Sequence, residues 1–82
     1  MIHEFKVEPE IFDSIFQGER PWDIRLDADM VLQGDLVRYM EYVRGEGITG
    51  RWFDVRVDHV ERLTYLDLDD FVGMTLIPVI YS

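Results

Sequence analysis

The feature that most constrains the fold is the alternation of side chains from residue 51 to residue 63. Phe53, Val55 and Val57 alternate with residues that are mostly charged. In a β-strand, successive side chains point to opposite faces, so a period of two separates an apolar face from a polar one. The pattern therefore predicts one long strand whose second face carries Trp52, Asp54, Arg56 and Asp58.

Other segments show strand patterns over shorter lengths. Residues 3–7 and 22–26 alternate, residues 36–43 are rich in β-branched and aromatic side chains, and residues 74–81 close the chain. Each is typical of a strand. Pro78 cannot donate a hydrogen bond within the last of these, so we expect that strand to lie at a sheet edge or to contain a bulge. An exposed edge would permit a weak dimer of an otherwise monomeric protein.

One short helix is predicted between the first two strands. Pro9 suits the first helical turn, where its missing N–H is not needed. Gly18 can end the helix in the left-handed conformation. The apolar residues between them fall on one face at helical spacing and are expected in the core: Ile11, Phe12, Ile15 and Phe16.

The loops complete the outline of a single domain covering residues 1–82. Residues 44–50 contain three glycines and predict a flexible hairpin loop, and residues 64–73 predict an acidic, irregular segment. The elements follow the order strand, helix and four strands. An 82-residue chain has too few residues for a β-sandwich. We expect a mainly β, α+β fold, a small and partly open barrel of about five strands with one helix.

Charge is the most informative bulk property. Seventeen acidic residues face eight basic ones, for a formal net charge of −9. Such a field repels nucleic acid, which proteins usually bind by neutralising phosphates with Lys and Arg. The excess of acid either confers solubility or faces a basic protein partner. The absence of cysteine excludes disulfides and thiolate metal sites, and no apolar stretch approaches the length of a membrane helix. We therefore expect a soluble, cytoplasmic protein.

Residues 18–25, GERPWDIR, resemble the signature of ASCH domains, which are PUA-like β-barrels. That signature follows the first helix and contains a Gly, a Lys two residues later, then an acid and an Arg. Downstream, residues 33–35 are similar to the family's Gly-Asp turn. Residues 39–42 and 48–51 are similar to the strand-loop-strand of a small ASCH-related branch of uncharacterised function, and residues 55–60 and the closing strand continue the similarity. The resemblance extends over nearly the whole chain.

The resemblance implies a pocket beside the signature, in a superfamily associated with RNA and modified nucleotides. One ASCH-like branch is enzymatic and removes an acyl group from acetylcytidine with a Lys, a Thr three residues later and a Glu. By position, Arg20 replaces that Lys and Asp23 replaces that Thr. A guanidinium stays protonated at neutral pH, and Asp has no hydroxyl to donate. We therefore expect a binding module without catalytic residues, cofactor or metal.

Four residues of the signature form the candidate ligand site. On a strand, Asp23 and Arg25 share a face, so they either pair as a structural brace or present donors beside an acceptor. Arg20 or Arg25 would bind the phosphate, carboxylate or base edge of a ligand. Trp22 points to the opposite face, where it is either part of the core or a platform on which a base stacks.

A second candidate surface is the outward row of Trp52, Asp54, Arg56 and Asp58. It is either a solvated face with cross-strand ion pairs or a protein interface anchored by the tryptophan. The acidic segment adds Asp67, Asp69 and Asp70, which lack the glycine and terminal Glu of a calcium loop. His3 and His59 would approach each other if the first and fourth strands were neighbours, which is a weak basis for a zinc site.

Two functions are open on the sequence alone. The first is a pocket for RNA or a nucleotide near Arg20, Asp23 and Arg25, which requires a concave and locally positive patch. The second is an acidic surface that mimics nucleic acid and occupies the channel of a basic protein, as inhibitors from phages and mobile elements do. An enzyme would require a converging carboxylate pair, Asp23 with Glu41 or Asp58.

Overall fold

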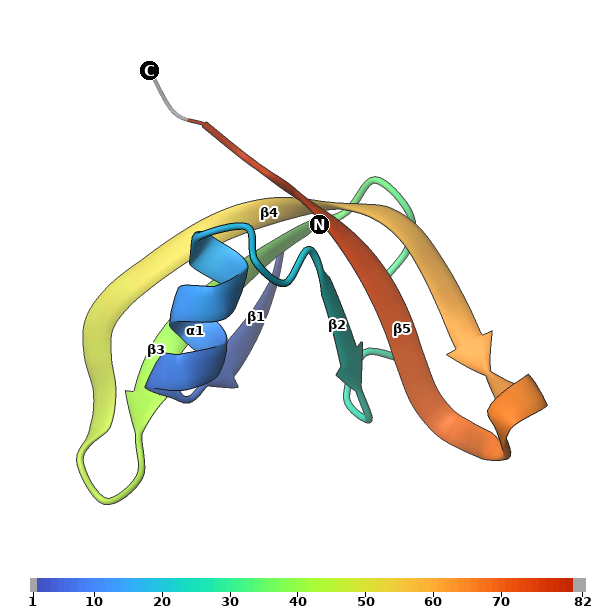
Figure 1. Ribbon diagram of the computed structural model, residues 1–82, viewed down its shortest axis with the longest axis horizontal. Coiled ribbons are helices and arrows are strands. Elements are labelled where there is room, and N and C mark those ends of the chain that lie inside the picture. Colours follow the sequence, from blue (N-terminus) through green and yellow to red (C-terminus); the bar gives the residue numbers. More distant parts are fainter. Residues whose placement is uncertain (1, 81–82) are drawn as a thin grey trace.

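A computed structural model describes residues 2–80 of the chain. Five strands form one mixed sheet in the order β1-β3-β4-β5-β2, in which β1 is parallel to β3 and the other pairs are antiparallel (Figure 1). The elements along the chain are β1 (Ile2–Val7), α1 (Pro9–Phe16), β2 (Trp22–Arg25), β3 (Leu36–Val43), β4 (Gly47–Leu63), a 3-10 turn η1 (Thr64–Leu66) and β5 (Leu68–Pro78).

The sheet is bent around its core, and α1 lies inside the bend against β3 and β4 (Figure 1). Phe12 of the helix packs edge-on against Phe53, with ring centroids 4.9 Å apart. The apolar inner face of β4, with Val55 and Val57, is buried as its alternation predicts. The fold is mainly β, with one short helix after the first strand and a sheet that does not close, as expected.

The helix follows its sequence signals. Pro9 occupies the first turn, and Gly18, with φ of 78°, follows the end of the helix. Phe12 and Ile15 are buried, but Phe16 is 57% exposed and reaches the core only at its edge, through ring contacts with Phe12 and Phe53. The prediction that all four apolar helix residues are core is therefore wrong for Phe16, because two turns present a face narrower than four large side chains.

The long strand begins earlier than its alternation predicts. β4 starts at Gly47, so the hairpin loop shortens from residues 44–50 to residues 44–46. Gly45 and Gly47 have positive φ angles of 85° and 94°, which a tight turn between β3 and β4 requires. A register shift between Met40 and Tyr42 marks an irregularity at this end of the pair.

The acidic segment is more ordered than expected. Residues 64–73 were predicted to be irregular, but only η1 and Asp67, which has a φ of 58°, interrupt the strands. From Leu68 onward the chain is β5, paired with β4. The irregular interpretation is wrong because backbone pairing with a long neighbouring strand outweighs the low strand propensity of acidic residues.

Pro78 does not mark an edge strand. β5 lies between β4 and β2, and Pro78 is its last residue, beyond the final β2 pair of Trp22 with Thr75. Its missing N–H therefore costs no hydrogen bond to β2. The strands at the two edges of the sheet are β1 and β2, and the weak dimer expected through the Pro78 strand stays a prediction. Residue 81, the predicted end of this strand, lies outside the described residues.

Side chains bring the two edge strands together. The guanidinium of Arg25 on β2 lies over the ring of Phe5 on β1, 4.3 Å from its centroid. The Tyr39 hydroxyl of β3 donates a hydrogen bond to Asp23 of β2 at 2.8 Å. We call these four residues the seam. No helix among residues 2–80 is long and apolar enough to cross a membrane.

Candidate functional site

Asp23 is the centre of the seam. It is 4% exposed, and its carboxylate accepts hydrogen bonds from the Tyr39 hydroxyl at 2.8 Å and from the Ile24 backbone N–H at 3.0 Å. The guanidinium groups of Arg25 and Arg20 lie 3.6 and 3.8 Å from its oxygens. A buried carboxylate is tolerated only when donors and positive charge surround it. Asp23 therefore links β2 to β3 through a buried hydrogen bond and nearby positive charges.

Arg25 has its donors engaged within the protein. Its Nε and Nη2 donate to the two oxygens of Asp27 at 2.6 and 3.0 Å, and its Nη1 faces Asp23. Burial opposes the charge of Arg25, but the hydrogen bond and charge of Asp27 outweigh it, so the pKa of Arg25 is raised. The same hydrogen bond lowers the pKa of Asp27. The brace expected of Asp23 and Arg25 is the arrangement that the structure shows.

Arg20 and Trp22 are arranged differently: Trp22 lies toward solvent, and Arg20 extends between its ring and Asp23. Trp22 is 44% exposed, and the guanidinium of Arg20 lies 4.2 Å from its ring centroid. The Nε of Arg20 is buried without a hydrogen-bond partner in the described part of the chain. Of the two positions left open for Trp22, the core is excluded. A stacked, partly exposed indole remains.

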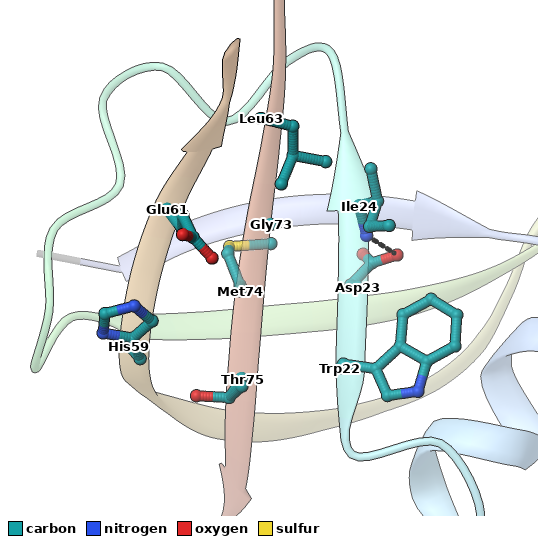
Figure 2. A pocket seen from close by; sticks show the side chains of 9 residues that line it. All are labelled: Trp22, Asp23, Ile24, His59, Glu61, Leu63, Gly73, Met74 and Thr75. Carbon is teal, nitrogen blue, oxygen red and sulfur yellow. Dashed lines mark hydrogen bonds between the residues drawn. The ribbon is translucent and has the colours of Figure 1, made fainter. Parts of the chain in front are cut away.

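Trp22 forms one wall of a hollow of about 210 Å³ on the outer face of the sheet (Figure 2). We call this hollow the Trp22 pocket. Trp22 and Ile24 lie on its β2 side, while His59 and Glu61 lie on its β4 side (Figure 2). Its floor is β5, and the residues that complete the lining are Asp23, Leu63, Gly73, Met74 and Thr75.

Gly73 is what leaves the pocket open. It pairs with Ile24 on one side and with Glu61 on the other, so all three positions share the outer face. A methyl group at Gly73 would lie 3.5 Å from the Leu63 side chain and would fill part of the floor. The missing side chain therefore creates a depression between the two flanking strands.

Sequence reasoning identified one side of this pocket and missed the other. His59, Glu61 and Gly73 belong to two strands that are distant in sequence from the signature. A register shift between Val57 and His59 breaks the alternation, so His59 and Glu61 lie on the outer face and not on the face of Val55 and Val57, and a single sequence does not reveal such a bulge. The alternation of residues 51–63 was the available signal, but it did not show which strand would lie beside them.

The two histidines do not approach each other. β1 is next to β3 and not to β4, and the Nε2 of His3 lies 2.8 Å from Asp35. The condition under which His3 and His59 would meet is therefore not fulfilled, and His3 has the hydrogen-bonded role instead. Within residues 2–80 no group of three or more His, Cys, Asp and Glu side chains could hold a metal ion.

The outward row on β4 is only partly a surface. Asp54 is 3% exposed and accepts two hydrogen bonds from Arg38, its cross-strand partner, at 2.8 and 3.0 Å. Its carboxylate is thus not on an open face, and the cross-strand ion pair proposed for this row is present. Trp52 is 50% exposed, with Arg38 stacked over its ring at 3.9 Å. Arg56 and Asp58 are exposed.

The carboxylates considered for catalysis have separate partners. Glu41 accepts hydrogen bonds from Thr49 at 2.8 Å and from Arg51 at 2.9 Å, whereas Asp23 is bound by Tyr39. Asp58 is exposed at the register shift of β4.

Burial and the charge of Asp23 raise the pKa of Tyr39, so its phenol remains a hydrogen-bond donor at neutral pH.

Most of the arginine side chains form ion pairs with carboxylates of the same protein. Six of the seven arginines form ion pairs within the described residues: Arg20, Arg25, Arg38, Arg44, Arg51 and Arg62. Around the signature, Arg20 and Arg25 face Asp23 and Asp27, so the four charges cancel. The locally positive patch expected there does not form.

Comparison with known proteins assigns the chain to a family but does not assign it an activity. A family model described as a domain of unknown function, DUF3850, matches residues 2–76. No curated protein matches the chain.

Proposed function

Because the chain belongs to the DUF3850 family, whose description assigns no activity, we propose from the geometry that it is a non-enzymatic binding module of the ASCH/PUA-like type. Its ligand is a nucleobase, in RNA or in a modified nucleotide, bound in the Trp22 pocket. The observation that carries the proposal is Trp22 itself. A half-exposed indole backed by a guanidinium, at the wall of a hollow, is an arrangement suited to base stacking.

The fold and the signature support the ASCH/PUA-like assignment. The order of strand, helix and four strands with an unclosed sheet is what that resemblance implies. Residues 18–25 form the helix end, the Trp22 wall and the β2 half of the seam. One short segment would thus serve two purposes, since its buried side chains join the edge strands and its exposed Trp22 presents the pocket.

The scarcity of free positive charge defines the kind of ligand. Phosphate recognition depends on unpaired Lys and Arg, and the arginines beside the pocket already face carboxylates. We therefore propose recognition of the base and not of the backbone. Glu61 would accept hydrogen bonds from an amino or imino group of the base, and His59 would accept or donate one.

The size of the pocket agrees with this choice. Pockets for drug-sized ligands occupy about 300–1,000 Å³, whereas the Trp22 pocket measures about 210 Å³. A single planar base fits such a hollow better than a whole dinucleotide. The outer location also leaves the rest of an RNA strand free to extend into solvent.

The test uses the fluorescence of Trp22 alone. Since the protein has two tryptophans, Trp52→Phe leaves Trp22 as the only indole. We expect nucleosides and short single-stranded RNA to quench it, with little change between low and physiological salt. Trp22→Ala removes this reporter, so its affinity is measured by the fluorescence anisotropy of a labelled short RNA, and we expect binding roughly 5- to 150-fold weaker, the effect of losing one stacked base.

Trp52 provides a matched control, because it is also half exposed and also stacked by an arginine. In a Trp22→Phe background, the remaining Trp52 should show no quenching by the same ligands. Equal quenching of both indoles would indicate non-specific collision and would contradict the proposal. No quenching of Trp22 by any nucleoside or RNA would also overturn it.

A further inference from the structure

A second surface lies where β4 turns into β5. The turn and the start of β5, residues 64–70, project at the lower right of Figure 1, away from α1. We call these residues the acidic turn. Three of its large apolar side chains are exposed: Tyr65 at 67%, Leu66 at 54% and Leu68 at 39%. Contiguous exposed apolar side chains on a small soluble domain mark an interaction site.

A neighbouring loop extends this apolar surface. Leu26 and Phe71 line a second hollow of about 510 Å³ at the end of β2. Leu26 is 58% exposed and Met30, further along the same loop, is 75% exposed. An ion pair of 3.2 Å between Arg62 and Asp29 ties this loop to β4 next to the acidic turn. The exposed apolar side chains thus come from two segments held at one end of the sheet.

The charge of this end has one sign. Asp67, Asp69 and Asp70 are exposed, and no Lys or Arg lies within residues 64–70. The nearest bases along the paired strands do not compensate, because Arg62 already binds Asp29 and Arg25 already binds Asp27. The exposed apolar side chains of the acidic turn are therefore surrounded by carboxylates whose charge no nearby base among residues 2–80 compensates; we call these carboxylates the rim.

We propose that the acidic turn and the adjoining loop dock a basic protein segment that carries an apolar anchor side chain. Charge complementarity selects this occupant. A second copy of the chain would bring the same carboxylates and a net charge of −9 against them. Nucleic acid carries charge of the same sign. A cationic segment meets the rim favourably, while its apolar side chain occupies the space beside Tyr65 and Leu66.

This docking surface is independent of the base-binding proposal, although Ile24 lines both hollows. Variants that separate them must therefore leave Ile24 unchanged. Asp67→Asn is suitable at the turn, because Asn accepts the left-handed backbone that Asp67 adopts. Tyr65→Ser and Leu66→Ser remove side chains that are more than half exposed and do not belong to the core.

The experiment titrates the whole ¹⁵N-labelled protein with a synthetic peptide of alternating Lys and Leu. Two matched peptides replace all Leu by Ser or all Lys by Glu. We expect amide shift changes centred on residues 24–30 and 62–71, with the Lys-Leu peptide alone. Tyr65→Ser combined with Leu66→Ser should weaken binding roughly 5- to 30-fold, the loss expected of interface anchors.

Charge is tested with a matched pair of double variants. Asp69→Asn with Asp70→Asn should weaken binding and its salt dependence, whereas Glu4→Gln with Glu10→Gln, which neutralises two other exposed acids, should not. Equal effects of the two pairs would reduce the interaction to diffuse net charge and overturn the proposal. Tight binding of the peptide in which Glu replaces every Lys would contradict the proposal as well. So would amide shift changes centred on another face of the protein.

Discussion

Trp22 and Asp23 are adjacent in sequence and have opposite roles because strand alternation sends their side chains to opposite faces. Asp23 lies in the seam with Tyr39, where each satisfies the polar group of the other. Trp22 lies outside, where Arg20 covers its ring. At the scale of single residues, a buried structural carboxylate and the exposed indole that we propose to bind a base are thus neighbours in the sequence.

Removal of the Tyr39 hydroxyl tests the structural half. Tyr39→Phe deletes the donor to a buried carboxylate, so the free energy of unfolding should fall by about 1.5–3 kcal/mol, the usual value of a hydrogen bond to a charged group. Urea denaturation measures the change. Tyr65→Phe, at an exposed position, is the control and should change stability by less than about 0.5 kcal/mol. Equal losses in both variants would show that the bond to Asp23 has no special role.

The same hydroxyl predicts a pH dependence. Burial, the negative charge of Asp23 and their hydrogen bond raise the pKa of Tyr39 above its ordinary value of 10.0. Above that pH the unfolded chain releases the phenolic proton and the folded protein keeps it, so the unfolded state gains stability. The stabilisation by Tyr39 is therefore complete below the ordinary pKa and decreases as pH rises beyond it. Urea titrations over an alkaline pH series should show a steeper decline in the parent protein than in Tyr39→Phe, and identical slopes would refute the assignment.

At the scale of elements, β5 connects the two halves of the Trp22 pocket. It pairs with β2 on one side and β4 on the other, and its outward residues form the floor. Gly73 stands at the crossing point, with ordinary backbone geometry and space for a methyl group. A strand interior gains stability from a side chain, so the glycine is better explained by the pocket than by folding.

Gly73→Ala should separate folding from binding. Alanine at this position should leave the free energy of unfolding unchanged or raise it by up to about 1 kcal/mol, while the filled floor reduces the quenching of Trp22 by nucleosides. Gly34→Ala is the opposite control. Gly34 has a φ of 90°, so alanine there should destabilise the protein by about 1–2 kcal/mol and leave nucleoside affinity of the folded fraction intact. A destabilised Gly73→Ala variant with full affinity would reverse this interpretation.

At the scale of the whole molecule, repulsion among carboxylates opposes folding. The ion pairs use most of the arginines, and the net charge of −9 remains on the surface. Compaction brings these charges closer together than they are in the unfolded chain. Added salt screens such repulsion over roughly 8–10 Å at physiological ionic strength.

The melting temperature should therefore rise as KCl is added from low to physiological concentration. Thermal unfolding followed by circular dichroism measures it. Glu4→Gln combined with Glu10→Gln, which removes two exposed acidic charges, should melt higher in low salt and respond less to KCl. A melting temperature that falls with KCl would show that the internal ion pairs contribute more than the repulsion.

The extent to which sequence predicts this molecule follows from the range of the forces involved. Local patterns located the helix, β3 and the inner face of β4, since each depends on neighbouring residues and on burial of one face. The pairing of Asp23 with Arg25 also followed from strand geometry. Strand order, and with it the positions of His59 and Glu61 beside Trp22, depends on contacts between distant segments that no local period encodes.

The errors have the same origin. The acidic residues at the start of β5 disfavour a strand locally, and pairing with β4 overrides that preference. Asp54 has the polarity of a surface residue, but its cross-strand neighbour Arg38 compensates its charge in a buried position. Pro78 indicates a missing donor, and only the sheet shows that β2 has ended before it.

The strand order also has a consequence for the time at which the protein acquires its shape. β2 is synthesised well before β5, which is the strand that it pairs with among residues 2–80. Until residues 72–75 emerge, β2 cannot pair, and the Trp22 pocket has neither its floor nor its opposite wall. The Trp22 pocket therefore forms only once β5 has paired with both β2 and β4, in one late step of folding and not gradually along the chain.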